Sequence, residues 1–283
     1  METNIIKAII NLVHCPITEL REYAESHNRA NNMGEALEEY IKDIFAGTVN
    51  ENDIAIRNRR ISKCFSYLGN QNNPPDSIIS GGDSLEVKKI ESKTSGLALN
   101  SSYPKAKLFA SSNMITDACR RCETWTEKDI IYAVGVLKNN ILSNLCMVYG
   151  VDYAASEEIY TRIKTVISQG VNSIQGVEFA ETNELGRVNR VDPLGITYLR
   201  VRGMWGIENP MKVFSYIYRR DDSKAFNFMA LINKEKYHTF GEDTVILEAL
   251  AAEVDSLVIT DVEIRTPDNP AILKQAKLIT YNV

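Results

Sequence analysis

The sequence predicts an α/β (α+β) fold in which a mixed β-sheet is flanked by helices. Three observations favour this class. Apolar residues in the N-terminal part recur at the spacing of one helix face, alternation with a period of two begins at Asp76, and residues 176–283 are rich in strand-like runs. With 283 residues, 44% of them hydrophobic, the chain is long enough to bury a substantial core.

We expect one domain with three parts. Residues 1–70 form a helical N-terminal part, because residues 5–13 and 32–47 each place apolar side chains on one helix face. Pro16 ends the first of these helices. Residues 69–75 are polar and rich in proline and asparagine, which is typical of a loop.

The central part, residues 71–175, contains a predicted β-hairpin. Residues 77–80 and 84–91 have strand-like alternation on either side of a Gly-Gly-Asp turn. The other elements expected here are a loop at 94–104, strands at 129–137 and 145–149, and a helix at 156–168. In the strand-rich third part, residues 176–283, we expect strands at 197–202, 213–218, 227–232 and 257–265, with a helix at 242–253.

The net charge of −5 argues against a protein that coats nucleic acid non-specifically. Basic residues are nevertheless concentrated in residues 57–63, 88–128 and 187–224. These stretches can converge on one positive cleft or remain separate solvated faces, and the sequence leaves both arrangements open.

Several classes of protein are disfavoured by features that the sequence lacks. It has no apolar run of about 18 residues, so we expect no membrane-spanning helix. The N-terminus does not resemble a secretory signal, and five scattered cysteines do not suggest a disulfide framework. Neither GxGxxG nor GxxxxGK(S/T) occurs, so we expect no use of ATP. The sequence therefore predicts a cytoplasmic protein without membrane contact.

The residues most informative about chemistry are Asp76, Glu86 and Lys88. Side chains alternate across a strand, so Glu86 and Lys88 lie on one face of the second hairpin strand. Leu85 and Val87 lie on the other face, where they pack against a helix. Asp76 starts the partner strand, which brings its carboxylate close to Glu86. Two adjacent carboxylates repel each other unless a cation lies between them, and oxygen ligands suit Mg²⁺.

This group fits metal-assisted hydrolysis of a phosphodiester bond. Asp76 and Glu86 are the expected metal ligands, and Lys88 can orient or deprotonate the attacking water. The same residue types also occur by chance on solvated strand edges. Their place on a hairpin, after a helical segment and before further strands, is the order of the PD-(D/E)xK nuclease core.

Besides Asp76, Glu86 and Lys88, residues 16–23 (PITELREY) and 34–43 (GEALEEYIKD) resemble type II restriction endonucleases of the NgoPII family. The resemblance covers nearly the whole chain. It implies a Mg²⁺-dependent, homodimeric endonuclease that cuts double-stranded DNA at a short palindrome, which is GGCC for the namesake of the family. A DNA repair or structure-specific nuclease of the same superfamily and a non-catalytic DNA-binding protein remain open alternatives.

Many nucleases of this superfamily place a glutamate from the preceding helix near the metal, and Glu35, Glu38 and Glu39 are the candidates. Glu38 lies nearest the apolar stripe of the expected helix, whereas Glu35 points away from it. We therefore expect Glu38 to approach the site. The alternative is a solvated face that contains all three.

Two sets of basic residues are expected to contact DNA. The first set follows the catalytic strand and suits contacts to phosphates, which position a duplex without reading it. Its members are Lys89, Lys93, Lys105, Lys107, Arg120 and Arg121. The second set suits guanine recognition in the major groove. Its members are Arg187, Arg190, Arg200 and Arg202, of which the last two share one strand face. Surface charge without DNA contact is the alternative for each residue.

Two further features are left without a function. Cys119 and Cys122 form a CxxC pair, but a structural zinc site needs four ligands and no second pair is within reach. We expect both to pack as small apolar residues on one helix face. Trp205 can insert between bases, although a tryptophan beside a strand more often belongs to the core.

Overall fold

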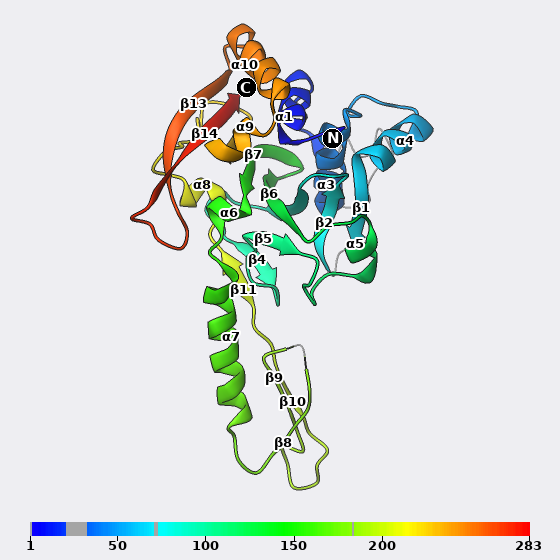
Figure 1. The fold of residues 1–283 in the computed structure, drawn as a ribbon, viewed down its shortest axis with the longest axis vertical. Helices are drawn as coiled ribbons and strands as arrows, with labels where there is room; N and C mark the ends of the chain where they lie inside the picture. The colour runs from blue at the N-terminus through cyan, green and yellow to red at the C-terminus, as the bar shows by residue number, and fades with distance from the viewer. Residues whose placement is uncertain (1, 21–32, 71–72, 183) are drawn as a thin grey trace.

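The structure is a computed structural model that describes residues 2–20, 33–70, 73–182 and 184–283 (Figure 1). Within these residues, a nine-stranded mixed sheet has the order β1-β2-β3-β6-β7-β12-β14-β13, and β5 pairs with β6 beside this path. Its strands are β1 (Phe65–Asn70), β2 (Asn73–Ile79), β3 (Ser84–Ile90), β5 (Lys107–Phe109), β6 (Glu127–Lys138), β7 (Ile141–Tyr149), β12 (Asn227–Asn233), β13 (Leu257–Arg265) and β14 (Leu273–Asn282).

Helices cover both faces of this sheet. On one face, α1, α3 and α10 share a hydrophobic core with the sheet; on the other, α6 and α8 contribute to a second core. The helices are α1 (Ile5–His14), α3 (Met33–Ala46), α4 (Ile54–Cys64), α5 (Asp117–Arg121), α6 (Gly150–Tyr153), α7 (Glu157–Asn172), α8 (Pro210–Val213), α9 (Lys234–His238) and α10 (Glu242–Glu253). No helix in the described ranges is long and apolar enough to span a membrane.

Successive side chains of a strand point to opposite faces of the sheet, so a strand can contribute to the cores on both faces. Leu85 and Val87 of β3 join the first core, which also contains Leu37 of α3, as the sequence predicts. The close approach of α3 to the sheet depends on Gly135 in β6. A Cβ atom at this position would lie 2.7 Å from a methyl group of Leu37, so a larger residue would push the helix away.

Strands β3 and β6 are parallel neighbours, so the chain must cross over between them. The crossover, residues 91–126, is not one long helix. It contains β4 (Leu97–Asn100), β5 and the short helix α5. Strand β4 pairs with β11 (Trp205–Ile207) in a separate two-stranded sheet. The predicted loop at 94–104 therefore contains a strand.

A projecting arm leaves the body of the molecule (Figure 1). We define the arm as α7 together with a three-stranded sheet. This sheet consists of β8 (Glu178–Phe179), β9 (Gly186–Asn189) and β10 (Leu199–Val201). No residue of α7 is buried, so its stability within one chain depends on few contacts.

The structure confirms several predicted elements and corrects others. The hairpin, the helix at 242–253 and the strands at 227–232 and 257–265 are present. The predicted loop at 69–75 is wrong, because β1 and β2 occupy most of it, and β1 lies in the part expected to be helical. Strand β2 accommodates its prolines because its ladder to β3 is formed by Ser77 and Ile78.

The predicted strand at 213–218 is also wrong. Asn209 caps α8 by accepting a hydrogen bond from the Lys212 backbone N–H, and Pro210 occupies the first turn, where its missing N–H is tolerated. Phe214 and Tyr218 are both buried in the second core, and their separation by four residues is helix-like. Helix α4 and strand β14 were not predicted.

Candidate active site

The hairpin brings Asp76 and Glu86 face to face. Its register pairs Ser77 with Leu85, which places Asp76 of β2 opposite Glu86 of β3. The Asp76 carboxylate also accepts a hydrogen bond of 2.6 Å from the backbone N–H of Val87. The two acidic residues are therefore fixed by the backbone of neighbouring strands.

Strand β1 supports this arrangement from the other side of β2. A Cβ atom at Gly69 would lie 2.4 Å from the carbonyl oxygen of Pro75. Since no side chain tolerates that approach, glycine is required where β1 passes beside Asp76.

Lys88 connects the two carboxylates. Its Nζ lies 2.6 Å from Glu86 Oε1 and 4.0 Å from Asp76 Oδ2. Burial alone lowers the pKa of Lys88, but the neighbouring carboxylates of Glu86 and Asp76 outweigh it, and the pKa lies above its ordinary value. Lys88 is therefore a cation at neutral pH.

The carboxylates carry more negative charge than Lys88 neutralises. The side chains of Asp76 and Glu86 are only 15% and 13% exposed. Burial, and next the charge of Glu86, raise the pKa of Asp76 well above its ordinary range. Glu86 Oε2 is buried and accepts no hydrogen bond from any described residue. An unpaired buried oxygen of this kind is costly, so the site fits an additional cation.

Asp76 and Glu86 are the two carboxylates available as metal ligands in this site. No three His, Cys, Asp or Glu side chains within the described ranges come close enough together to hold a metal ion. Mg²⁺ is usually bound by one or two carboxylates, with water and phosphate oxygens in its other coordination positions. Asp76 and Glu86 therefore fit the expected metal.

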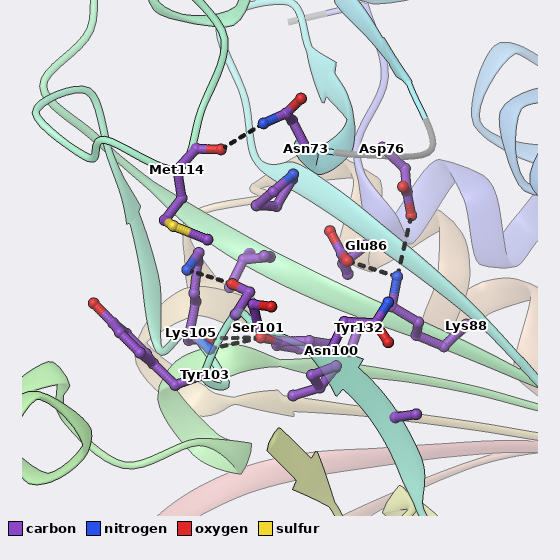
Figure 2. Close-up of a pocket in the computed structure, with 15 residues that line it drawn as sticks. Asn73, Asp76, Glu86, Lys88, Asn100, Ser101, Tyr103, Lys105, Met114 and Tyr132 are labelled. Carbon is purple, nitrogen blue, oxygen red and sulfur yellow. Dashed lines mark hydrogen bonds and ion pairs between the residues drawn. The ribbon is translucent and has the colours of Figure 1, made fainter. Parts of the chain in front are cut away.

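The site opens into a cavity of about 350 Å³ (Figure 2). Figure 2 shows Asp76, Glu86 and Lys88 together on one side, with Met114 and Lys105 across from them. Most of the opposite wall comes from the crossover, through residues 98–103, Lys105 and Met114. A chain segment distant from the catalytic motif thus completes the cavity.

Of the three candidate glutamates, Glu38 interacts electrostatically with both Lys88 and Asp76. Burial raises the pKa of Glu38, as expected for a carboxylate that faces the protein. Glu39 instead pairs with Lys42 at 2.8 Å and with Arg57 at 2.5 Å. The structure thus places Glu38 in the neighbourhood that the sequence predicts.

The first predicted set of DNA-contacting residues lies on the crossover and its surroundings. Most of these residues already have protein partners: Lys89 with Glu91, Lys93 with Asp222, Lys107 with Glu127, and Arg120 with Asp117. Arg120 also donates to the backbone carbonyls of Ala110 and Ser112, which gives it a structural role. Arg121 is exposed, whereas Lys105 lines the cavity.

The second predicted set lies on the arm. Arg187 and Arg200 are cross-strand partners on β9 and β10. Arg200 and Arg202 both contact Glu184 Oε1, at 2.5 and 2.6 Å, so they share one face as expected. Arg190 pairs with Glu178 at 3.1 Å. The arm therefore presents a group of exposed guanidinium groups away from the cavity.

Aromatic residues join the arm to the cavity wall. Tyr103 of the crossover stacks on Tyr160 of α7, with ring centroids 5.5 Å apart. Trp205 lies edge-on to both rings. Trp205 is therefore packed in protein, in agreement with the alternative to base insertion. Cys119 and Cys122 also pack in a hydrophobic cluster, as expected.

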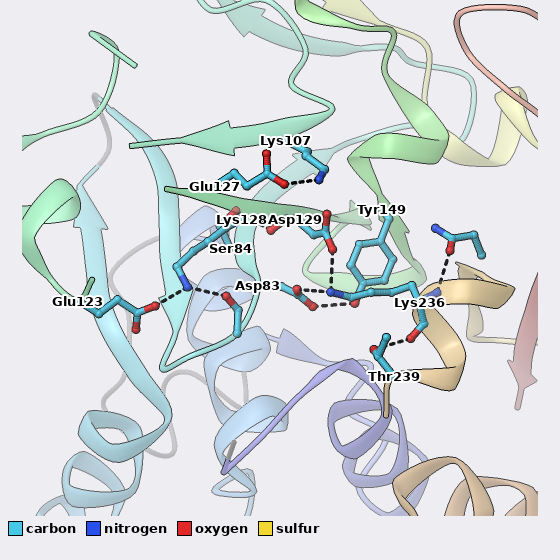
Figure 3. Close-up of polar contacts among 12 residues, drawn as sticks. Asp83, Ser84, Lys107, Glu123, Glu127, Lys128, Asp129, Tyr149, Lys236 and Thr239 are labelled. Atoms are coloured by element: carbon cyan, nitrogen blue, oxygen red, sulfur yellow. Dashed lines mark hydrogen bonds and ion pairs between the residues drawn. The ribbon is translucent and has the colours of Figure 1, made fainter. Parts of the chain in front are cut away.

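A second cluster of charges was missed by sequence reasoning (Figure 3). Lys236 of α9 lies 2.6 Å from Asp83 Oδ1 and 2.7 Å from Asp129 Oδ2. Tyr149 donates a hydrogen bond of 2.7 Å to Asp83 Oδ2. Because Asp83 belongs to the turn of the hairpin, this cluster anchors β2 and β3 to the C-terminal part. No local motif marks Lys236, which lies far along the chain.

Comparisons with known proteins identify relatives of this chain. The sequence matches the profile of the NgoPII restriction endonuclease family over residues 3–265. It is 55% identical over 281 residues to the type II restriction enzyme NgoPII of Neisseria gonorrhoeae, covering 99% of this chain and 100% of that protein. No solved structure matches the chain significantly.

Proposed function

Since the chain belongs to the NgoPII restriction endonuclease family, we propose that it uses Mg²⁺ to hydrolyse double-stranded DNA at a short palindrome. GGCC, the site that the family resemblance implies, is the proposed target. We further propose a homodimer, because two copies related by a two-fold axis present identical sites to the two strands of a palindrome.

The observation that carries the metal dependence is the unpaired, buried Oε2 atom of Glu86 beside Asp76. These two carboxylates would hold the ion. Bound there, Mg²⁺ would supply a water of lowered pKa and polarise the phosphate under attack. Both carboxylates are held in place by the protein, Asp76 by the Val87 N–H and Glu86 by Lys88.

Lys88 is suited to orient the attacking water and to offset phosphate charge. Although burial lowers it, the pKa of Lys88 beside Glu86 and Asp76 lies above its ordinary value, so the ammonium group is protonated and can donate hydrogen bonds. A protonated ammonium group favours the orienting role. Glu38 contributes negative charge near Lys88 from the α3 side.

The arm supports binding of a duplex. It begins beside the cavity wall, where Tyr103 contacts Tyr160, and extends away from the body (Figure 1). A duplex that enters the cavity would also meet the arginines of β9 and β10, whose forked donors suit guanine edges. We propose that this set reads bases and that the crossover set grips the backbone.

Incubation of plasmid DNA with the protein, with and without Mg²⁺, tests the proposed function. We expect discrete fragments that match GGCC sites, and we expect them only when Mg²⁺ is present. A smear would indicate a non-specific nuclease. A gel shift without cleavage in Mg²⁺ would contradict the catalytic proposal and favour a DNA-binding protein.

A further inference from the structure

Lys105 is a buried cation in the wall that faces the catalytic residues (Figure 2). It is only 8% exposed, and its Nζ donates a hydrogen bond of 2.9 Å to Ser102 Oγ. The ammonium also lies 4.7 Å from the centre of the Tyr103 ring. No carboxylate in the described part of the chain forms an ion pair with it. A buried charge without a counter-ion is costly, so this position is prepared for an anion.

The backbone of Lys105 is fixed relative to Glu86 by Tyr132. The Lys105 N–H donates to the Tyr132 hydroxyl at 2.7 Å, and the same hydroxyl donates to the Lys105 carbonyl at 3.1 Å. Tyr132 is buried in β6, where the parallel register pairs it with Glu86. Tyr132 therefore ties the loop that carries Lys105 to β6, which pairs with the strand that carries the unpaired oxygen of Glu86.

The anion that fits this position is a phosphate group of the substrate. Lys88 and Lys105 lie on opposite sides of Glu86 in Figure 2, and both line the same cavity. Burial lowers the pKa of Lys105 although Glu86 and Glu157 act in the opposite direction. A phosphodiester presents two charged non-bridging oxygens, so it can accept hydrogen bonds from two ammonium groups at once.

We propose that Lys105 Nζ donates a hydrogen bond to a non-bridging oxygen of the phosphodiester that is hydrolysed, on the side opposite Lys88. This inference rests on the proposed nuclease function. It adds a substrate-binding group to Asp76, Glu86 and Lys88. It also gives Lys105 a different role from the other basic residues of the crossover. Those residues contact the duplex elsewhere or are neutralised by protein partners.

The variant Lys105→Met tests the inference, because methionine retains the apolar stem and removes the charge. Under single-turnover conditions with Mg²⁺, we expect cleavage to slow by about 100-fold. The same change can be added to Lys88→Ala, which we expect to bind DNA without cutting it. There it should reduce the slope of log affinity against log salt concentration by about 0.9. The melting temperature should not fall, because an unpaired buried charge has been removed.

Lys138→Met is the matched control, since Lys138 is exposed at the far end of β6 and does not line the cavity. It should cleave DNA like the wild type. Tyr132→Phe loosens the backbone of Lys105 without changing charge, so it should slow cleavage by about tenfold and leave the salt slope unchanged.

The outcomes separate this inference from the proposed function. If the wild type does not cut DNA, the nuclease function itself fails. If the wild type cuts and Lys105→Met cuts equally fast with the same salt slope, only the phosphate contact is refuted. A lower melting temperature for Lys105→Met would show that the ammonium serves the fold, and that result would also overturn the inference.

Discussion

Two lysines lie at different ends of the same β-hairpin, and each contacts two acidic side chains. At the open end, Lys88 contacts Glu86 and Asp76. At the turn, Lys236 contacts Asp83 and Asp129. Both clusters are largely buried, and both hold elements of the sheet together. In residue composition they are nearly the same.

The two clusters differ in what remains unpaired. Both oxygens of Asp83 accept hydrogen bonds, one from Lys236 and the other from Tyr149. In the Lys88 cluster, Glu86 Oε2 is buried without a donor in the described residues. A satisfied ion-pair network stabilises one arrangement of the chain, whereas an incomplete network is suited to receive a ligand. Substitutions in each cluster can test this distinction.

Lys88→Ala should have the largest effect. Loss of the ammonium group removes the donor that orients water and phosphate, so we expect cleavage to fall by at least about a thousandfold. DNA binding should change little, because the contacts proposed for the arm lie outside the cavity. Single-turnover cleavage and gel-shift titration measure the two effects. Equal losses of binding and cleavage would contradict a catalytic role.

Lys236→Met should affect stability. Asp83 and Asp129 would then remain partly buried without their cation, at a cost of about 3 kcal/mol in the free energy of unfolding. Denaturant titration measures this loss, and folded protein at low temperature should retain cleavage activity. If Lys236→Met were fully stable but inactive, the functional distinction between the two clusters would be wrong.

Mg²⁺ binding should weaken as the pH falls. Burial and Glu86 raise the pKa of Asp76 to about 7. Below this pKa the carboxyl group is protonated and must release its proton before it binds a cation, so affinity should fall roughly tenfold per pH unit. Above it, affinity should be constant. Calorimetric titration of the metal at pH 5.5, 6.5 and 8 measures the dependence, and a flat profile would refute proton-linked binding.

Glu86→Gln should give the smallest effect in the absence of metal, and its sign is informative. At pH 8 the substitution breaks the Lys88–Glu86 ion pair, but Lys88 keeps Asp76 as a partner and the repulsion between the two buried carboxylates disappears. The free energy of unfolding should therefore rise, by no more than about 1 kcal/mol. The corresponding change at the turn, Asp83→Asn, should lower it because Lys236 loses a partner. Thermal melts without Mg²⁺ compare the two variants. Destabilisation by both changes would show that the clusters serve the same purpose.

Local sequence patterns predicted the part of the site that lies on one hairpin. Asp76, Glu86 and Lys88 could be placed because side-chain alternation and a short turn determine their relative positions. Helix geometry likewise favoured Glu38 over Glu35 and Glu39. The roles of these residues in hydrolysis are predictions.

Long-range packing determined what the sequence could not reveal. Lys236 reaches Asp83 through the pairing of distant strands, and Lys105 faces Glu86 because Tyr132 joins a loop to β6. Neither placement can be recognised from a pattern in the local sequence. The run at 213–218 was misread because apolar residues four apart fit a helical turn, and the capping by Asn209 outweighed its strand-like composition.

The parallel pairing of β3 and β6 also bears on how such enzymes diversify. The crossover between these strands supplies the wall opposite Asp76 and Glu86, the proposed metal ligands, which themselves belong to the sheet. Insertions and substitutions in a surface connection disturb a folded core much less than changes within its strands. We therefore expect descendants of this scaffold to vary in how residues 91–126 grip the DNA backbone, with Asp76, Glu86 and Lys88 inherited intact.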